Sequence, residues 1–121
     1  MLKPCLRHCN IKFSSKSLEH LPLKEENNYE VNFDKIPKYI LRKTKLLCLN
    51  YPNNPTSKLA SKEMYLKAIE KAKKYKFMII NDNAYGDLVF NDKDLINFRD
   101  VDGFYDVGIE LNSFSKIYPI R

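Results

Sequence analysis

Several residue patterns are missing from this 121-residue chain, and each absence narrows its class. No run approaches the roughly 20 apolar residues of a membrane-spanning helix, and residues 1–17 contain no apolar core of the kind that a secretory signal requires. Cys5, Cys9 and Cys48 are an odd count without the dense spacing of a secreted disulfide scaffold, which favours a reducing compartment. We therefore expect a cytoplasmic protein. Organelle targeting stays open because the acid-free first 17 residues contain serine.

Tryptophan is absent, and basic residues do not alternate with aromatic ones, which argues against a surface that stacks on nucleic-acid bases. The formal charge of +6 is concentrated near the N-terminus, since residues 1–18 carry four basic side chains and no acidic one, leaving about +2 for the rest. A nucleic-acid-binding module is therefore the least favoured class, and we expect neither nucleic acid nor a membrane as a partner.

The chain is predicted to have a basic, disordered leader over residues 1–17 and one domain over residues 18–121, long enough to bury a core. Within the leader, Cys5-Leu6-Arg7-His8-Cys9 could offer thiolate and imidazole ligands to a metal. A closed zinc site takes four ligands, however, and the sequence has no second cluster. A leader is favoured over a metal site, and no metal is expected.

Apolar patterning predicts strands that alternate with helices. Continuous apolar runs at 45–50 and 77–80 and a further run at 107–111 predict strands, the first two buried on both faces of a parallel sheet. Apolar residues recur every three or four positions over 61–75, which predicts a helix, so residues 45–81 form a βαβ unit. We therefore expect an α/β fold: part of a three-layer α/β/α arrangement around a mostly parallel sheet.

The segments flanking this unit carry weaker signals. They predict a short strand at 18–23 that Pro22 ends, a short strand or extended segment at 29–33, a helix at 35–44 capped by Asp34, a turn of helix or short strand at 88–90, a polar loop at 91–97, and a turn at Asp102-Gly103.

Polar motifs follow three of the predicted strands at the ends where ligands bind in parallel sheets. They are Asn50-Tyr51-Pro52-Asn53-Asn54-Pro55-Thr56, Asp82-Asn83-Ala84-Tyr85 and Ser113-Phe114-Ser115-Lys116. A lysine amine is a nucleophile when deprotonated and can form a Schiff base. Each residue also has an ordinary interpretation: a solvated lysine in a serine-rich loop, a turn asparagine, a packed tyrosine or a capping aspartate.

Together and in this order, the three motifs resemble the large domain of the class I/II (fold type I) aminotransferases, which use pyridoxal phosphate. The resemblance covers roughly residues 21–118 and implies transfer of an amino group between an amino acid and a 2-oxo acid. It implies that Lys116 is catalytic, forming the Schiff base with the cofactor and then moving a proton. It also implies a cis Asn54–Pro55 bond and cofactor binding by Asn54, Asp82, Tyr85, Ser113, Ser115 and Lys116, with Asp82 facing the pyridine nitrogen, Asn54 and Tyr85 the ring oxygen, and the serines the phosphate.

The sequence also departs from the family pattern. The family has a phosphate-binding arginine eight residues after the lysine, whereas Arg121 follows Lys116 by five, with Pro119 between them. The N-terminal phosphate loop, the aromatic residue that stacks on the ring and the small-domain arginine are not matched. We therefore expect weak or no turnover by this chain alone, and the family's homodimer is not carried over.

Two alternatives to transamination stay open. One is another fold type I reaction, such as the β-elimination of a C–S lyase, since the same lysine, aspartate and tyrosine serve it. The other is a truncated homologue without catalytic activity. The sequence does not name the amino-acid substrate.

Overall fold

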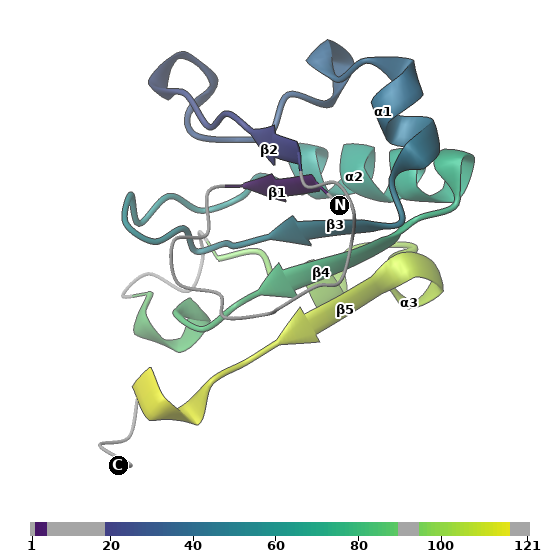
Figure 1. Cartoon of the computed structure of the whole chain (residues 1–121). Coiled ribbons are helices and arrows are strands. Elements are labelled where there is room, and N and C mark those ends of the chain that lie inside the picture. The colour runs from purple at the N-terminus through teal and green to yellow at the C-terminus, as the bar shows by residue number, and fades with distance from the viewer. Residues whose placement is uncertain (1, 5–18, 90–94, 117–121) are drawn as a thin grey trace.

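Five parallel strands form the sheet in the part of the chain that the structure describes. A computed structural model describes residues 2–4, 19–89 and 95–116, apart from the side chains of residues 2–4 and 116. The strands are β1 (Leu2–Pro4), β2 (Glu19–Leu21), β3 (Leu46–Leu49), β4 (Met78–Asp82) and β5 (Gly108–Leu111). They lie in the order β2-β1-β3-β4-β5, and every neighbouring pair is parallel (Figure 1). The predicted α/β class with a parallel sheet is confirmed.

Helices and short 3-10 turns connect the strands. The α-helices are α1 (Lys38–Lys43), α2 (Lys62–Tyr75) and α3 (Phe104–Val107). The 3-10 turns are η1 (Glu25–Asn27), η2 (Phe33–Lys35), η3 (Gly86–Leu88), η4 (Phe98–Asp100) and η5 (Phe114–Lys116). No helix within the described ranges has both the length and the apolar character needed to cross a membrane.

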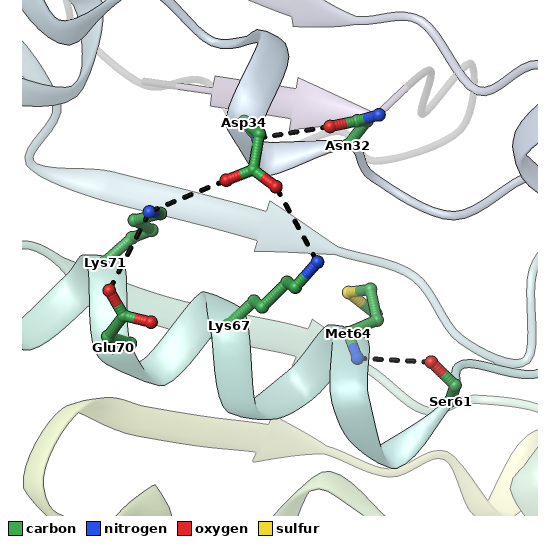
Figure 2. A network of polar contacts seen from close by, with 7 residues as sticks. All are labelled: Asn32, Asp34, Ser61, Met64, Lys67, Glu70 and Lys71. Carbon is green, nitrogen blue, oxygen red and sulfur yellow. Dashed lines mark hydrogen bonds and ion pairs between the residues drawn. The ribbon is translucent and has the colours of Figure 1, made fainter.

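Helix α2 matches its prediction to within one residue because its signals are local. The Ser61 side chain caps the helix by accepting a hydrogen bond from the Met64 N–H (3.1 Å), and the chain leaves the helix at Lys76 with a left-handed φ of 59°. The buried stripe packs on the sheet and consists of Met64, Tyr65, Ala68, Ile69 and Ala72. Lys67 and Lys71 project from the helix towards Asp34 of η2 (Figure 2).

The two faces of the sheet differ in burial. Leu47, Leu49, Ile79 and Asn81 are at most 1% exposed, and the register pairs Leu47 with Ile79 and Leu49 with Asn81, so all four point to the face that α2 covers. Alternate residues point to the opposite face, where Met78, Ile109 and Leu111 are each about 40% exposed. Asp82 belongs to this second set, since it directly follows Asn81 in β4.

The N-terminal expectations need three corrections. Residues 2–4 form β1 between β2 and β3, although the whole leader was expected to lack structure; residues 1 and 5–18, with the cysteine cluster, lie outside the described part. Residues 29–33 form neither the predicted strand nor an extended segment, because Tyr29 lies in a turn with a left-handed φ of 58° and Phe33 begins η2. The Asn32 side chain caps η2 by accepting a hydrogen bond from the Asp34 N–H.

The third correction concerns α1, which begins at Lys38 and has Pro37 at its N-cap, so Asp34 does not cap it. The residue before a proline is pushed out of the α region, and Ile36 has an extended ψ of 122°. The helix therefore starts after the proline. Elsewhere the predicted strand at 18–23 and the turn at Gly103 are confirmed, and the segment after Tyr85 is the 3-10 turn η3. Of the predicted loop at 91–97, residues 91–94 lie outside the described part.

Candidate functional site at the carboxyl ends of the strands

The three polar motifs meet at one edge of the sheet. Strands β3, β4 and β5 run parallel to one another (Figure 1). Leu49 is in register with Asn81, and Asp82 is in register with Leu111. Neighbouring strands lie about 4.8 Å apart, so the residues that follow each strand come close together. This is the edge where open parallel sheets bind ligands.

Asn50 fastens the tip of β3 to the tip of β4. Its amide Nδ2 donates to the Asp82 carbonyl oxygen (2.9 Å), and its Oδ1 accepts from the Asn54 N–H (3.0 Å). The residue is only 3% exposed. Sequence reasoning gave Asn50 no role of its own, although its position after a buried apolar strand was visible. Asn50 thereby fixes the backbone at two predicted site residues.

A second pair of hydrogen bonds, made by the Asn81 side-chain amide, lies beside those of Asn50. The Tyr51 N–H donates to Asn81 Oδ1, and Asn81 Nδ2 donates to the Tyr51 carbonyl, both at 3.2 Å. These groups are buried, so water does not compete for them. The tips of β3 and β4 are therefore joined twice by neutral side chains.

The bend after β3 is held by its own asparagine. Asn53 accepts from the Ser57 N–H (2.7 Å) at its carbonyl and from the Thr56 hydroxyl (2.8 Å) at its side chain, while its N–H donates to the Lys58 carbonyl (2.9 Å). The Asn54–Pro55 bond is cis, as the family resemblance implied. Tyr51–Pro52 is also cis, which the sequence did not indicate.

The bend brings Asn54 against Tyr85, 31 residues later in the chain. The Asn54 Nδ2 donates to the Tyr85 hydroxyl oxygen at 3.2 Å. Both side chains line a groove of about 430 Å³ whose other walls include Pro52, Pro55, Leu59, Leu88 and Val89. Two residues that the family resemblance assigned to one ligand are thus in direct contact, and both line the same largely apolar groove.

Asp82 ends β4 and is partly buried. Its backbone is held by Asn50 on one side, and it pairs in register with Leu111 on the other. Its side chain leaves the sheet on the face opposite α2, because the side chain of Asn81 points towards α2. The fold therefore presents a carboxylate at the same sheet edge as the Asn54–Tyr85 pair.

The serines of the third motif follow β5. Ser113 and Ser115 lie 2.8 Å apart between their hydroxyl oxygens, with Ser113 half-buried and Ser115 exposed. Lys116 ends η5 by its backbone, but its side chain lies outside the described part of the chain, and so does Arg121. The position of the lysine amine relative to Asp82 stays a prediction.

Two tyrosine phenols close to this edge are structural. Burial raises the pKa of Tyr51 well above its usual range, with a smaller contribution from Glu30, and burial followed by the charge of Glu110 raises the pKa of Tyr65 further. The Tyr51 hydroxyl donates to the Tyr29 carbonyl (2.7 Å). Both phenols stay protonated near neutral pH, so they serve packing and hydrogen bonding and do not exchange protons with a ligand.

Within the described residues, no cluster of three or more His, Cys, Asp or Glu side chains is arranged to hold a metal ion. The described side chains at this edge offer an amide, a phenol, a carboxylate and two hydroxyls. These groups donate and accept hydrogen bonds, and the carboxylate can pair with a cationic group of a ligand.

Comparison with known proteins identifies relatives of this arrangement. The family model for aminotransferase class I and II matches residues 5–119. An LL-diaminopimelate aminotransferase from Aquifex aeolicus is 42% identical over 98 residues, covering 81% of this chain and 25% of that protein. Transaminase BacF from Bacillus subtilis is 42% identical over 108 residues, covering 89% and 27%.

Solved structures agree with the sequence relatives. The substrate-bound BacF structure from Bacillus subtilis superposes with a TM-score of 0.78 at 42% identity, covering 84% of this chain and 26% of that one. The chain spans about a quarter of the length of the curated relatives that it matches.

Proposed function

This chain belongs to the class I and II aminotransferase family, and from that membership we propose that it serves a pyridoxal-phosphate-dependent transfer of an amino group between an amino acid and a 2-oxo acid. Members of the family generally depend on pyridoxal phosphate. The observation that carries the proposal is the 3.2 Å hydrogen bond between Asn54 and Tyr85, at the sheet edge that also bears Asp82.

The residues at this edge fit the cofactor's chemistry. The ring of pyridoxal phosphate is flat and largely apolar, with a basic nitrogen, a ring oxygen and a phosphate at its rim. The groove beside Asn54 and Tyr85 has apolar walls and a polar lip, and the two hydroxyls of Ser113 and Ser115 lie together after the next strand. A carboxylate, two neutral polar groups and two hydroxyls match the rim of the ring group by group.

Each residue has a proposed task. The Asp82 carboxylate holds a proton on the ring nitrogen by charge pairing, which lets the bound cofactor withdraw electrons from the substrate. Asn54 and Tyr85 bind the ring oxygen and orient the ring, and Ser113 and Ser115 donate to the phosphate. Lys116 is proposed to attach the cofactor through its amine and then to carry a proton as general acid and base.

The substrate is proposed to be an amino acid with its 2-oxo acid as the other partner. Seven relatives are named LL-diaminopimelate aminotransferase, which makes that amino acid the first donor to test, and BacF is named a transaminase. The cytoplasmic location expected from the sequence stays a prediction.

Cofactor absorbance tests the proposal directly. Mixing the chain with pyridoxal phosphate should give the absorbance band of an attached cofactor, and Lys116→Ala should abolish it. Lys67→Ala, which removes an exposed lysine of α2, is the matched control and should leave the band intact. A chain that shows no band, or a band that survives in Lys116→Ala, would be evidence against the proposed role.

The rate of the half-reaction, in which an amino acid converts the bound cofactor, tests whether Asp82 does more than bind the cofactor. Asp82→Ala should slow the conversion of the bound cofactor by an amino acid far more than it weakens cofactor attachment, because the electron withdrawal depends on the ring proton. Asp87→Ala, an exposed aspartate in η3, provides the control. Equal half-reaction rates in wild type and Asp82→Ala would contradict the assignment. Transfer of the amino group to added 2-oxoglutarate, which gives glutamate, distinguishes transamination from elimination, which releases pyruvate and ammonia.

A further inference from the structure

Asn83, which lies between the site residues Asp82 and Tyr85, packs against Gly86, the residue that follows Tyr85. Asn83 is only 6% exposed, and its Oδ1 is buried without a hydrogen-bond partner. A Cβ placed on Gly86 would lie 2.3 Å from that oxygen and 2.9 Å from Nδ2. The Asn83 amide therefore packs directly on the bare Cα of a buried glycine, with no room for a methyl group.

The two partners of this contact are anchored to different parts of the fold. The Asn83 N–H donates to the Leu111 carbonyl of β5 at 2.8 Å, which ties Asn83 to the sheet edge. Gly86 begins the turn η3, in which the Leu88 N–H donates to the Tyr85 carbonyl (3.0 Å) and the Val89 N–H to the Gly86 carbonyl (3.2 Å). The distance between sheet edge and turn is therefore set where the Asn83 side chain meets Gly86.

The turn in question carries Tyr85, whose hydroxyl accepts from the Asn54 amide. Asn54 is in turn held by Asn50, and Asn50 by the Asp82 carbonyl. These contacts close a ring that starts and ends at the tip of β4. If Gly86 moved away from Asn83, the ring would open at the 3.2 Å bond between Tyr85 and Asn54, because that bond is exposed, whereas the Asn54 backbone is held by Asn50.

We propose that Asn83 and Gly86 are positioning residues whose contact holds the Tyr85 hydroxyl against the Asn54 amide. An unpaired buried acceptor is rare in proteins, and here packing rather than a hydrogen bond keeps the amide oxygen in place. The consequence for the cofactor rests on the proposed function, whereas the hydrogen bond itself is measurable without any cofactor.

The side-chain amide resonances of Asn54 report this bond in the cofactor-free chain. Tyr85→Phe provides the reference for the lost bond. Gly86→Ala should move the Asn54 resonances towards that reference, and Asn83→Ala combined with Gly86→Ala should return them towards wild type, since the smaller residue leaves room for the methyl group. An unchanged Asn54 signal in Gly86→Ala, or a double variant as displaced as the single one, would overturn the proposal.

Gly108→Ala is the matched control. A Cβ at Gly108 would lie 2.3 Å from Phe104 Cδ2, a steric conflict as severe as that at Gly86 but outside the site. It should leave the Asn54 resonances in place; a shift equal to that of Gly86→Ala would mean that general destabilisation is the cause. If Gly86→Ala alone does not fold, recovery of the fold in the double variant supports the contact, and failure to recover refutes it.

Cofactor affinity adds a second readout. Gly86→Ala should weaken pyridoxal phosphate binding by about two- to tenfold, the range that one hydrogen bond is worth, and the double variant should recover most of it. If the wild-type chain binds no cofactor, the proposed function fails, and the Asn54 resonances still decide whether Asn83 and Gly86 position Tyr85.

Discussion

Asn50→Ala is expected to be among the most damaging single changes at the site edge, although it removes only a small neutral side chain. The substitution deletes the bond to the Asp82 carbonyl and the bond from the Asn54 N–H, at a residue that is 3% exposed. Each bond contributes about 1 kcal/mol net, and removing a buried partner adds a desolvation cost, so the expected loss of stability is about 2–4 kcal/mol.

Urea unfolding followed by far-ultraviolet circular dichroism measures this loss. With a urea m-value of about 2 kcal/mol/M, the middle of the usual range, the midpoint should fall by about 1–2 M while the slope stays constant. The expected loss of about 2–4 kcal/mol is a large share of the roughly 5–15 kcal/mol free energy of unfolding of a typical domain. Both the fold and the position of the Asp82 backbone are therefore expected to suffer.

Two matched variants show whether the two side-chain hydrogen bonds of Asn50 cause the loss of stability. Asn54→Ala keeps the backbone bond to Asn50 and removes only the exposed contact with Tyr85, so it should cost less than about 1 kcal/mol. Asn32→Ala removes one capping bond to the Asp34 N–H, away from the site, and should cost about 1 kcal/mol. If Asn50→Ala were no worse than these two, the Asn50 side chain would not hold the strand tips together and our interpretation of the edge would be wrong.

Three further variants test other parts of the fold. Burial raises the pKa of Tyr65, so the folded state keeps a proton that the unfolded state loses above about pH 10. The contribution of this group to the free energy of unfolding should therefore be constant below that pH and fall by about 1.4 kcal/mol per pH unit above it. Alkaline unfolding should be less steep in Tyr65→Phe. Ser61→Ala should cost about 1 kcal/mol in urea unfolding through loss of the α2 cap, with Ser61→Thr as the variant that retains it. Asp34→Ala should cost less than about 1 kcal/mol despite facing both Lys67 (3.7 Å) and Lys71 (3.8 Å) in Figure 2, since Asp34 is 67% exposed; a larger loss, removed by salt, would show that this surface network matters.

The parts of the fold that the sequence predicts well are those with local signals. Helix α2 has its cap at Ser61 and its apolar stripe within one continuous segment, and the strands at 46–49 and 78–82 are apolar runs long enough to recognise. The convergence of Asn54 and Tyr85 followed from topology, since parallel strands end at one edge. Local pattern and chain order were sufficient for these features.

The missed features depend on partners far away in the chain. Strand β1 has three residues and forms only because β2 and β3 lie on either side of it, and no periodicity is visible in so short a segment. The start of α1 was misplaced by three residues because Pro37 was assigned to the first turn, whereas its effect on Ile36 excludes the earlier start. For Asn50, the sequence indicated a polar bend but could not choose its hydrogen-bond partners among so many nearby amides.

The abundance of asparagine at this edge has a physical reason that also bears on the site. An amide side chain donates and accepts at once, so Asn50 and Asn81 can each bridge two backbone groups across the strand tips without introducing charge. An aspartate in place of Asn50 could not donate to the Asp82 carbonyl and would put a second negative charge next to Asp82. Because the amide side chains are neutral, they add no charge beside the Asp82 carboxylate at the tip of β4. The role proposed for Asp82, keeping a ring nitrogen protonated by charge pairing, requires such surroundings.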